Sequence, residues 1–155
     1  NLKKDITLDQ ASEAFKLTHN AGIESVAYFM IGSPEETPET IKKTIDFAKN
    51  LNPDFAQFSI TIPYPGTELH NLATKEGGIL GKWDDYAYAK LGDINNAVFV
   101  TKTLSSQELR AWLKEAYVSF YLRPSYIWKK LKKTRSLGEL KTNVTGLRML
   151  LQTTL

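Results

Sequence analysis

The sequence predicts an α/β fold, on three observations. Two apolar, β-branched stretches, at 24–31 and 55–61, are each followed by a segment of helical periodicity. About a dozen helical residues separate the two stretches, which is the arrangement of a βαβ unit with parallel strands and a right-handed crossover. The chain has 155 residues, 42% of them hydrophobic, so it is long enough for one domain with a buried core.

The first helix is predicted to begin after Thr7, because Thr7 and Gln10 have the spacing of a capping box. Gly22 supplies its stop. Its stripe at helical spacing consists of Ala11, Ala14, Phe15 and Thr18. The stretch ESVAYFMI at 24–31 then shows no polar alternation, which is typical of a strand that is apolar on both faces inside a parallel sheet.

The second helix is predicted to have Thr37 as its N-cap and Pro38 at its first position, and to end at 52–53, Asn-Pro. Its apolar face consists of Ile41, Thr44, Ile45, Ala48 and Leu51. A second strand, FAQFSIT at 55–61, follows it. Thr67 is then suited to cap a third helix.

The carboxyl-terminal part is predicted to be helical after a less regular segment at 79–100. That segment is typical of a loop with aromatic anchors, and AVFVT at 97–101 suits a short strand. Ser105 and Glu108 form an S-x-x-E box that begins a helix, and Pro124 ends or kinks it. Its aromatic stripe is interpreted as a core face and consists of Leu109, Trp112, Leu113, Ala116, Tyr117, Phe120 and Tyr121.

Two further helices are predicted at 125–135 and 137–155, within a strongly basic tail. The whole chain carries a net charge of +3, but residues 123–155 carry eight Lys or Arg against Glu139, which leaves residues 1–122 acidic. This asymmetry suggests two parts with different roles.

The basic tail suits an anionic partner. Trp128 stands among several basic residues, Lys129, Lys130, Lys132, Lys133 and Arg135. A basic helix with an embedded Trp can lie on an anionic membrane surface. Nucleic-acid phosphates are an alternative partner, and a solvated helix packed on the domain is the plain structural interpretation. No apolar run approaches the ~18 residues of a membrane span, and no signal peptide is evident.

The loops after the two predicted strands are the candidate ligand site. In parallel α/β folds such loops lie at the carboxyl edge of the sheet, where ligands bind. The first loop contains Gly32, where a backbone can approach a ligand closely, and leads to a helix N-terminus. Glu35, Glu36 and Glu39 crowd that terminus, so a cationic or donor-rich ligand suits it better than an anion. An ordinary connector remains the alternative.

The second loop, PYPGT, is a rigid turn at the same predicted edge. Pro63 and Pro65 stiffen the chain, Gly66 permits an unusual dihedral angle, and Tyr64 offers a ring and a hydroxyl. Its position beside the first loop is what makes it a candidate.

Other chemistry is sparse in this sequence. His19 and His70 are the only histidines, and both are predicted to be helix-surface residues without metal-ligand spacing. The pair at 84–85, Asp-Asp, is predicted to face solvent. The chain contains no cysteine, which fits a cytosolic setting and excludes thiolate ligands, and it contains no phosphate-binding loop or nucleophile–base motif. No catalytic or metal-ligating residue is therefore predicted.

The stretch AGIESVAYFMIGSPEETPETIKKTIDFAKNLNPDFAQFSITIPYPGTELHNLA resembles the carboxyl-terminal half of a radical SAM domain. The resemblance is to the cobalamin-binding-domain group of Fe–S oxidoreductases, which includes anaerobic magnesium-protoporphyrin IX monomethyl ester oxidative cyclases. It covers residues 7–78, and LSSQELRAWLKEAYVSFYLRPSYIWKKLKK resembles the group's helical tail. The implied fold is the end of a partial TIM barrel at 1–103, followed by a basic helical extension at 104–155.

The resemblance implies a site for S-adenosylmethionine. Gly32 and Glu36 match the second Gly and the Glu of a G-x-I-x-G-x-x-x-E motif that lies beside the adenine, while Met30 replaces its Ile and Tyr28 its first Gly. Ser33 belongs to the same loop. The second loop is similar to a T-P-Y-P-G-T motif facing the cofactor and substrate cavity, and it contributes Thr61, Pro63 and Tyr64.

The resemblance also implies what lies outside this chain. The C-x-x-x-C-x-x-C loop that holds a [4Fe–4S] cluster, four barrel strands and any cobalamin domain would precede Asn1, so an amino-terminal part of the same polypeptide is the expected partner. The expected activity of the parent is reductive cleavage of S-adenosylmethionine for radical chemistry on a lipophilic or tetrapyrrole-like substrate, in the cytoplasm or at the membrane periphery. A non-catalytic binding module and an RNA-modifying radical SAM enzyme are the alternatives; nucleic acid is disfavoured because the tail is helical rather than β-rich.

Overall fold

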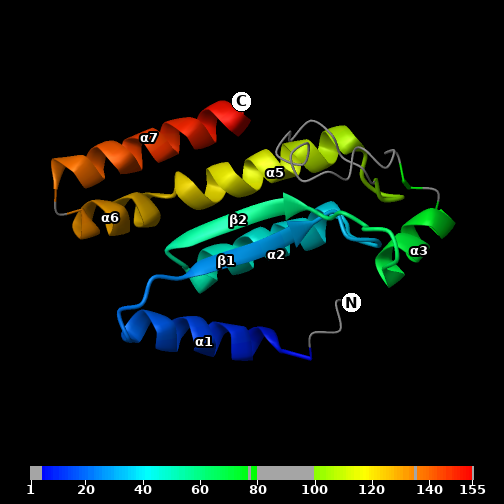
Figure 1. The fold of residues 1–155 in the computed structure, drawn as a ribbon, viewed down its shortest axis with the longest axis horizontal. Helices are drawn as coiled ribbons and strands as arrows, with labels where there is room; N and C mark the ends of the chain where they lie inside the picture. Colours follow the sequence, from blue (N-terminus) through cyan, green and yellow to red (C-terminus); the bar gives the residue numbers. More distant parts are fainter. Residues whose placement is uncertain (1–4, 77, 80–99, 135, 155) are drawn as a thin grey trace.

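The computed structural model describes residues 5–76, 78–79, 100–134 and 136–154 (Figure 1). Most of the predicted loop at 79–100 and most of the predicted strand at 97–101 lie outside these residues, as does the pair at 84–85. The elements are α1 (Leu8–Asn20), β1 (Val26–Ile31), α2 (Pro38–Leu51), β2 (Phe55–Ile60), α3 (Glu68–Glu76), α5 (Ser106–Tyr121), α6 (Pro124–Lys133) and α7 (Leu137–Thr154). Helix α2 connects the parallel strands β1 and β2, so the α/β class and the βαβ unit are confirmed.

The predicted helix starts are confirmed by their hydrogen bonds. Thr7 caps α1 in a complete capping box with Gln10, and Ser105 caps α5 in the same way with Glu108. Thr37 caps α2, with Pro38 in the first turn; its box partner is a threonine, Thr40. Such caps satisfy backbone N–H groups that have no partner inside the helix.

The predicted ends of α2 and α5 are confirmed, and at Pro124 the structure has an end rather than a kink. Asn52 closes α2 in the left-handed conformation, at φ 50° and ψ 47°. Pro124 does not kink a continuing helix; it starts α6, two residues after the C-cap Leu122 of α5. Proline is favoured in a first turn because its missing N–H would have no intrahelical partner there.

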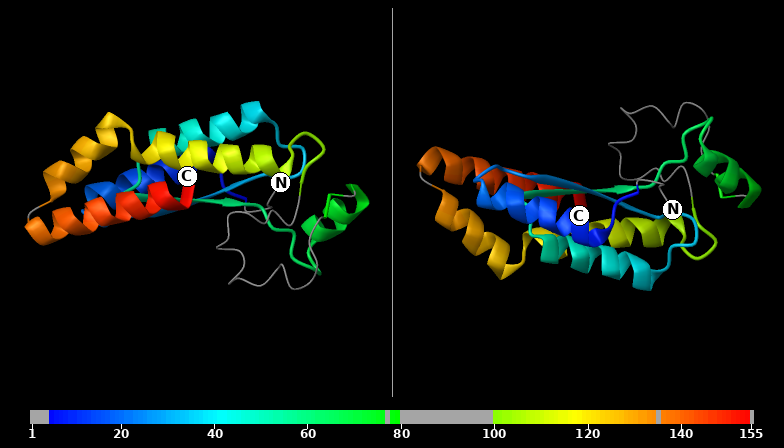
Figure 2. Two further views of the ribbon diagram at one scale, coloured as in Figure 1. Left: turned by 90° about the horizontal axis from the view of Figure 1, so that it is seen from above. Right: turned by 90° about the horizontal axis from the view of Figure 1, so that it is seen from below.

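The two-stranded sheet has one covered and one open face. Helices α2 and α5 lie on the same side of it, as the two views in Figure 2 show. Ala27, Ile31, Ala56 and Phe58 point toward these helices and are buried. The alternate residues of β1, Val26, Tyr28 and Met30, are exposed. The sequence predicted that this strand is buried on both faces. Among the described residues, only the face toward α2 and α5 is covered.

A hydrophobic cluster joins the βαβ unit to the α5 helix. Its buried members are Ile31, Ile41, Ile45, Ala48, Ala56, Phe58, Leu104, Leu109, Leu113, Ala116, Phe120 and Tyr126. The aromatic stripe of α5 is therefore confirmed as a core face. The division of the chain at residue 104 remains a prediction, and this shared core extends across it.

Candidate functional site

The loops after β1 and β2 meet at the carboxyl edge of the sheet. The strands are parallel and in register, with Ile31 opposite Ile60, so both chains leave the sheet at one end. The Thr61 N–H continues the ladder and donates to the carbonyl of Ile31 at 2.7 Å. One step further, Ser33 Oγ lies 3.2 Å from Thr61 Oγ1. The predicted juxtaposition of the two loops is present, and a hydroxyl pair bridges them.

Gly32 allows a helix to pack closely against the first loop. Its φ is +80°, a region that L-residues rarely adopt. A Cβ at this position would lie 2.9 Å from Leu109 Cδ2 of α5. The sequence suggested that a small residue allows a ligand to approach; in the structure the close neighbour is a side chain of the protein itself.

Glu36 folds back onto the loop that precedes it. Its Oε2 accepts hydrogen bonds from the N–H groups of Gly32 and Ser33, the latter at 3.0 Å. Burial raises the pKa of Glu36, and the two backbone donors only partly offset that effect. Its carbonyl in turn accepts from Thr103 Oγ1 at 2.5 Å. Glu36 therefore braces the backbone of the first loop, whereas Glu35 and Glu39 are exposed.

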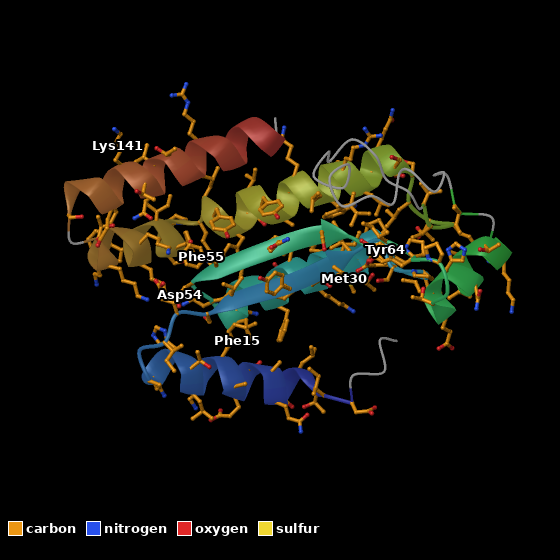
Figure 3. All side chains as sticks on the ribbon, viewed as in Figure 1. Phe15, Met30, Asp54, Phe55, Tyr64 and Lys141 are labelled. Atoms are coloured by element: carbon orange, nitrogen blue, oxygen red, sulfur yellow. The ribbon has the colours of Figure 1, made fainter. Side chains whose placement is uncertain are left out.

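The second loop is held by hydrogen bonds of its own. Thr67 Oγ1 accepts from the His70 N–H at 3.1 Å, which confirms Thr67 as the cap of α3. His70 Nδ1 donates to the carbonyl of the buried Pro63 at 3.0 Å, so this histidine secures the loop rather than only facing solvent. Gly66 has a φ of +86° and completes the turn. Tyr64 is 45% exposed beside it (Figure 3).

Two predicted site residues lie on the open face of β1. Tyr28 is 73% exposed and Met30 41% exposed, and their partners across the ladder are Gln57 and Ser59. The predicted residues therefore divide into an aromatic and thioether surface on the open face and a hydroxyl-bearing loop pair at its end. Such a surface suits stacking against a flat ring, with polar contacts at one side.

No metal centre is present among the residues that the structure describes. They contain no group of three or more His, Cys, Asp or Glu residues that could hold an ion.

The basic tail packs on the opposite, amino end of the strands. The Asp54 carboxylate is buried, and its Oδ1 lies 2.8 Å from Lys133 Nζ and 3.4 Å from Lys129 Nζ. Its Oδ2 accepts from the Ser25 N–H at 3.1 Å. Burial acts to raise the pKa of Asp54, but these hydrogen bonds and the lysine charges outweigh it and lower the pKa to about 2.

Other cations of the tail also contact the protein itself. Lys130 Nζ lies 3.7 Å from the ring centroid of Phe55, and Lys132 Nζ 5.2 Å from that of Trp128. Arg123 donates to the carbonyl of Lys49 at 3.1 Å. The predicted residue Arg135 lies outside the described residues.

Sequence reasoning missed Asp54 and Thr103. Asp54 follows an Asn-Pro helix stop and looks like an ordinary turn residue, and the lysines that contact it lie more than seventy positions away. Thr103 is similarly distant from Glu36. Neither pairing leaves a local pattern; only the excess of lysines without nearby acids hinted that a distant carboxylate was needed.

Comparison with known proteins gives several relatives. An uncharacterized methyltransferase of Pyrococcus horikoshii is 38% identical over 127 residues, covering 81% of this chain and 26% of the relative. An anaerobic magnesium-protoporphyrin IX monomethyl ester cyclase of Rubrivivax gelatinosus is 34% identical over 68 residues, 44% of this chain and 12% of the relative. The protein of the same name from Cereibacter sphaeroides is 27% identical over 129 residues, 81% of this chain and 20% of the relative.

These matches support the radical SAM resemblance at the level of the superfamily. The names are those of enzymes, a methyltransferase and two cyclases. The chain spans between 12% and 26% of the length of these relatives. No protein-family model matches it.

Proposed function

We propose that this chain is the carboxyl-terminal part of a radical SAM partial barrel and supplies one side of a cavity for S-adenosylmethionine and a substrate. The observation that carries the proposal is the meeting of the two strand-end loops beside an open apolar strand face. Ser33 and Thr61 are in contact at that edge, and Tyr28 and Met30 are exposed next to it. The similarity to a methyltransferase and to cyclases supports the same interpretation.

The residues present fit the adenosyl part of S-adenosylmethionine. Tyr28, Met30 and Tyr64 offer exposed apolar or aromatic surface for a flat base. Ser33 has a hydroxyl that can turn from Thr61 toward a ribose hydroxyl or an amine. In this proposal Gly32, Glu36 and the buried Pro63 shape the loops, and Glu36 fixes the backbone through the Gly32 and Ser33 N–H groups.

The iron–sulfur cluster of the proposed parent belongs to other parts of the polypeptide. This chain has no cysteine, so it offers no thiolate ligand for a [4Fe–4S] cluster. Together the cluster and S-adenosylmethionine would supply the reductive cleavage that starts radical chemistry, of the cyclase or methyltransferase type, on a lipophilic or tetrapyrrole-like substrate. The role of this chain is to bind and orient.

The edge of β1 that faces away from β2 is a candidate pairing site for another segment of the same polypeptide. In parallel pairing, alternate residues bond to opposite neighbours. The carbonyls of Ser25 and Ile31 accept from β2, so the backbone groups of Val26, Tyr28 and Met30 point to the other edge. No described strand pairs there. We propose that an upstream strand of a longer polypeptide occupies this edge.

Two measurements test the proposal. The reading frame upstream of Asn1 is expected to encode a C-x-x-x-C-x-x-C motif, and its absence would contradict the radical enzyme. Titration of the labelled chain with S-adenosylhomocysteine is expected to shift the NMR signals of Met30, Ser33 and Tyr64. Shifts confined to residues of α1 or α7 would place nucleoside binding elsewhere and overturn the site.

Two alternatives predict different results. A non-catalytic binding module predicts no upstream cysteine motif. An RNA-modifying radical enzyme predicts the motif together with RNA binding by the tail, for which Lys129 and Lys133 are poorly placed because both contact Asp54.

We also propose, for a cytoplasmic parent, peripheral membrane contact through one face of α6. Trp128 is 61% exposed, and Ile127 and Leu131 are partly exposed one turn apart. Lys132 is the neighbouring cation whose contact is with Trp128 rather than with Asp54. Of the helices in the described part of the chain, none is both long and apolar enough to span a membrane.

A further inference from the structure

Three tyrosine hydroxyls line the edge of β2 that does not pair with β1. Tyr121 Oη donates to the Ala56 carbonyl at 2.8 Å and accepts from the Ala56 N–H at 3.0 Å. Tyr117 Oη donates to the Phe58 carbonyl at 2.9 Å and accepts from the Phe58 N–H at 3.2 Å. Tyr126 Oη donates to the carbonyl of Asp54 at 2.9 Å.

These contacts have the pattern of a neighbouring strand. Along a strand edge, every second residue presents both its N–H and its C=O outward. The residues contacted are 54, 56 and 58, which are the alternate positions on that edge. A tyrosine hydroxyl carries one donor and can accept, so a single hydroxyl can satisfy both groups of one residue.

The spacing of helix and strand explains why two of these tyrosines lie on α5. Residues four apart in an α-helix are separated by about 6 Å along the axis. Residues two apart in a strand are separated by about 6.6 Å. Tyr117 and Tyr121 therefore stay in register with Phe58 and Ala56, with the helix antiparallel to the strand.

Packing holds the hydroxyls in place. The Tyr117 and Tyr121 rings stack at 6.2 Å, and Tyr117 meets the Phe58 ring edge-on at 5.4 Å. Burial raises the pKa of both phenols, which keeps them protonated and able to donate. Four residues before Tyr117 the helix has Leu113, a buried core residue without a hydroxyl, so on α5 the series ends there.

We infer that Tyr117 and Tyr121, continued by Tyr126, act as a surrogate strand that makes β2 the terminal strand of its sheet. Unpaired strand edges invite association with another chain. Closing this edge with side chains leaves strand addition to the β1 edge. The surrogate strand also fixes the register of α5 on the sheet, which places Leu109 against Gly32.

Amide hydrogen exchange of single variants of the full chain tests this inference. Tyr121→Phe is expected to raise the exchange rate of the Ala56 amide by roughly five- to tenfold, because that amide loses one hydrogen bond. The Phe58 amide should still exchange slowly. Tyr117→Phe should speed Phe58 and leave Ala56 slow. Tyr126→Phe is the matched control, because its hydroxyl contacts only a carbonyl of the edge and neither amide should change. Equal acceleration of both amides in every variant would indicate general loosening and overturn the inference.

Two further measurements do not depend on the stability of a single variant. In the unmodified chain, the hydroxyl protons of Tyr117 and Tyr121 should exchange slowly and show cross-relaxation with the Phe58 and Ala56 amides. Fast exchange of both hydroxyls would contradict the surrogate strand. The double variant Tyr117→Phe/Tyr121→Phe should associate at concentrations where the unmodified chain does not, measured by light scattering. A double variant that associates no more than the unmodified chain would refute the edge-closing role.

Discussion

The two ends of the parallel strands are built from different chemistry. At the carboxyl end lie hydroxyls, prolines, exposed apolar or aromatic side chains and the exposed glutamates Glu35 and Glu39, with Met30 and Tyr64 toward one side of Figure 3. At the amino end lie charges, where Asp54 is buried between lysines of α6. The carboxyl end therefore has exposed side chains that a ligand can contact, whereas the charges at the amino end form ion pairs within the protein.

This difference shows why a run of lysines is a poor guide to function. Five basic residues between 129 and 135 suggested an anionic partner outside the protein. Two of them, Lys129 and Lys133, contact a carboxylate of the same chain, and Lys130 covers Phe55. Three of the five positive charges are therefore engaged by the protein itself.

The largest effect is expected from removing the carboxylate at the amino end. Asp54→Ala removes the buried carboxylate that Lys129 and Lys133 contact and that accepts from the Ser25 N–H, and it should destabilise the fold by about 3 kcal/mol, as breaking a buried ion pair does. Urea unfolding measures it. Asp46→Ala is the control, because its pair with Lys49 at 2.7 Å is on the surface and its loss should be much smaller. Equal losses would contradict the assignment of Asp54 as the internal anchor.

The same carboxylate predicts a pH dependence. The folded-state pKa of Asp54, about 2, lies below its ordinary value of 3.8, so its stabilising contribution is present above pH 4 and lost as the pH falls toward 2. Unfolding midpoints of the unmodified chain and of Asp54→Ala should therefore converge over that range.

The next effect compares two glycines of the carboxyl end. Gly66→Ala should cost about 1 kcal/mol, because its φ is +86° but a Cβ would meet no atom within 4 Å. Gly32→Ala combines a φ of +80° with a Cβ 2.9 Å from Leu109, and should cost about 2 to 4 kcal/mol. Thermal or urea unfolding gives the difference. Equal losses of stability in the two variants would mean that the Leu109 side chain moves aside without cost and does not position the loop.

The predictable and unpredictable parts of this molecule differ by the range of the interactions involved. Caps at Thr7, Thr37 and Ser105 are pairings over three residues and can be read directly from the sequence. The meeting of the two loops followed from parallel pairing, which a βαβ unit imposes. The contacts of Leu109 with Gly32 and of Thr103 with Glu36 depend on where α5 docks, and no local pattern encodes that.

A smaller and more diagnostic effect concerns Glu36. Glu36→Ala removes the acceptor for two N–H groups and should cost about 1 to 3 kcal/mol. Glu36→Gln retains an acceptor oxygen. Because burial raises the pKa of Glu36, ionisation weakens the unmodified fold, and its relative stability falls as the pH rises above the ordinary value of 4.5.

The stability of Glu36→Gln relative to the unmodified chain should therefore increase between pH 4 and pH 7, as measured by denaturant unfolding. If Glu36→Gln instead loses as much stability as Glu36→Ala at both pH values, an acceptor oxygen alone is not sufficient. The charged carboxylate would then have a role beyond accepting from the two N–H groups.

The smallest effect tests the proposed membrane face of α6. Sedimentation with phosphatidylglycerol vesicles should show weak binding that Trp128→Ala reduces severalfold. Leu17→Ala, another exposed apolar position, is the matched control and should leave binding unchanged. Lys129, Lys130 and Lys133 contact Asp54 or Phe55. Salt should therefore weaken vesicle binding less than it would weaken the binding of a basic helix whose lysines are all free. Steep salt dependence would mean that these lysines leave their partners at the membrane, and absence of binding at low salt would end the proposal.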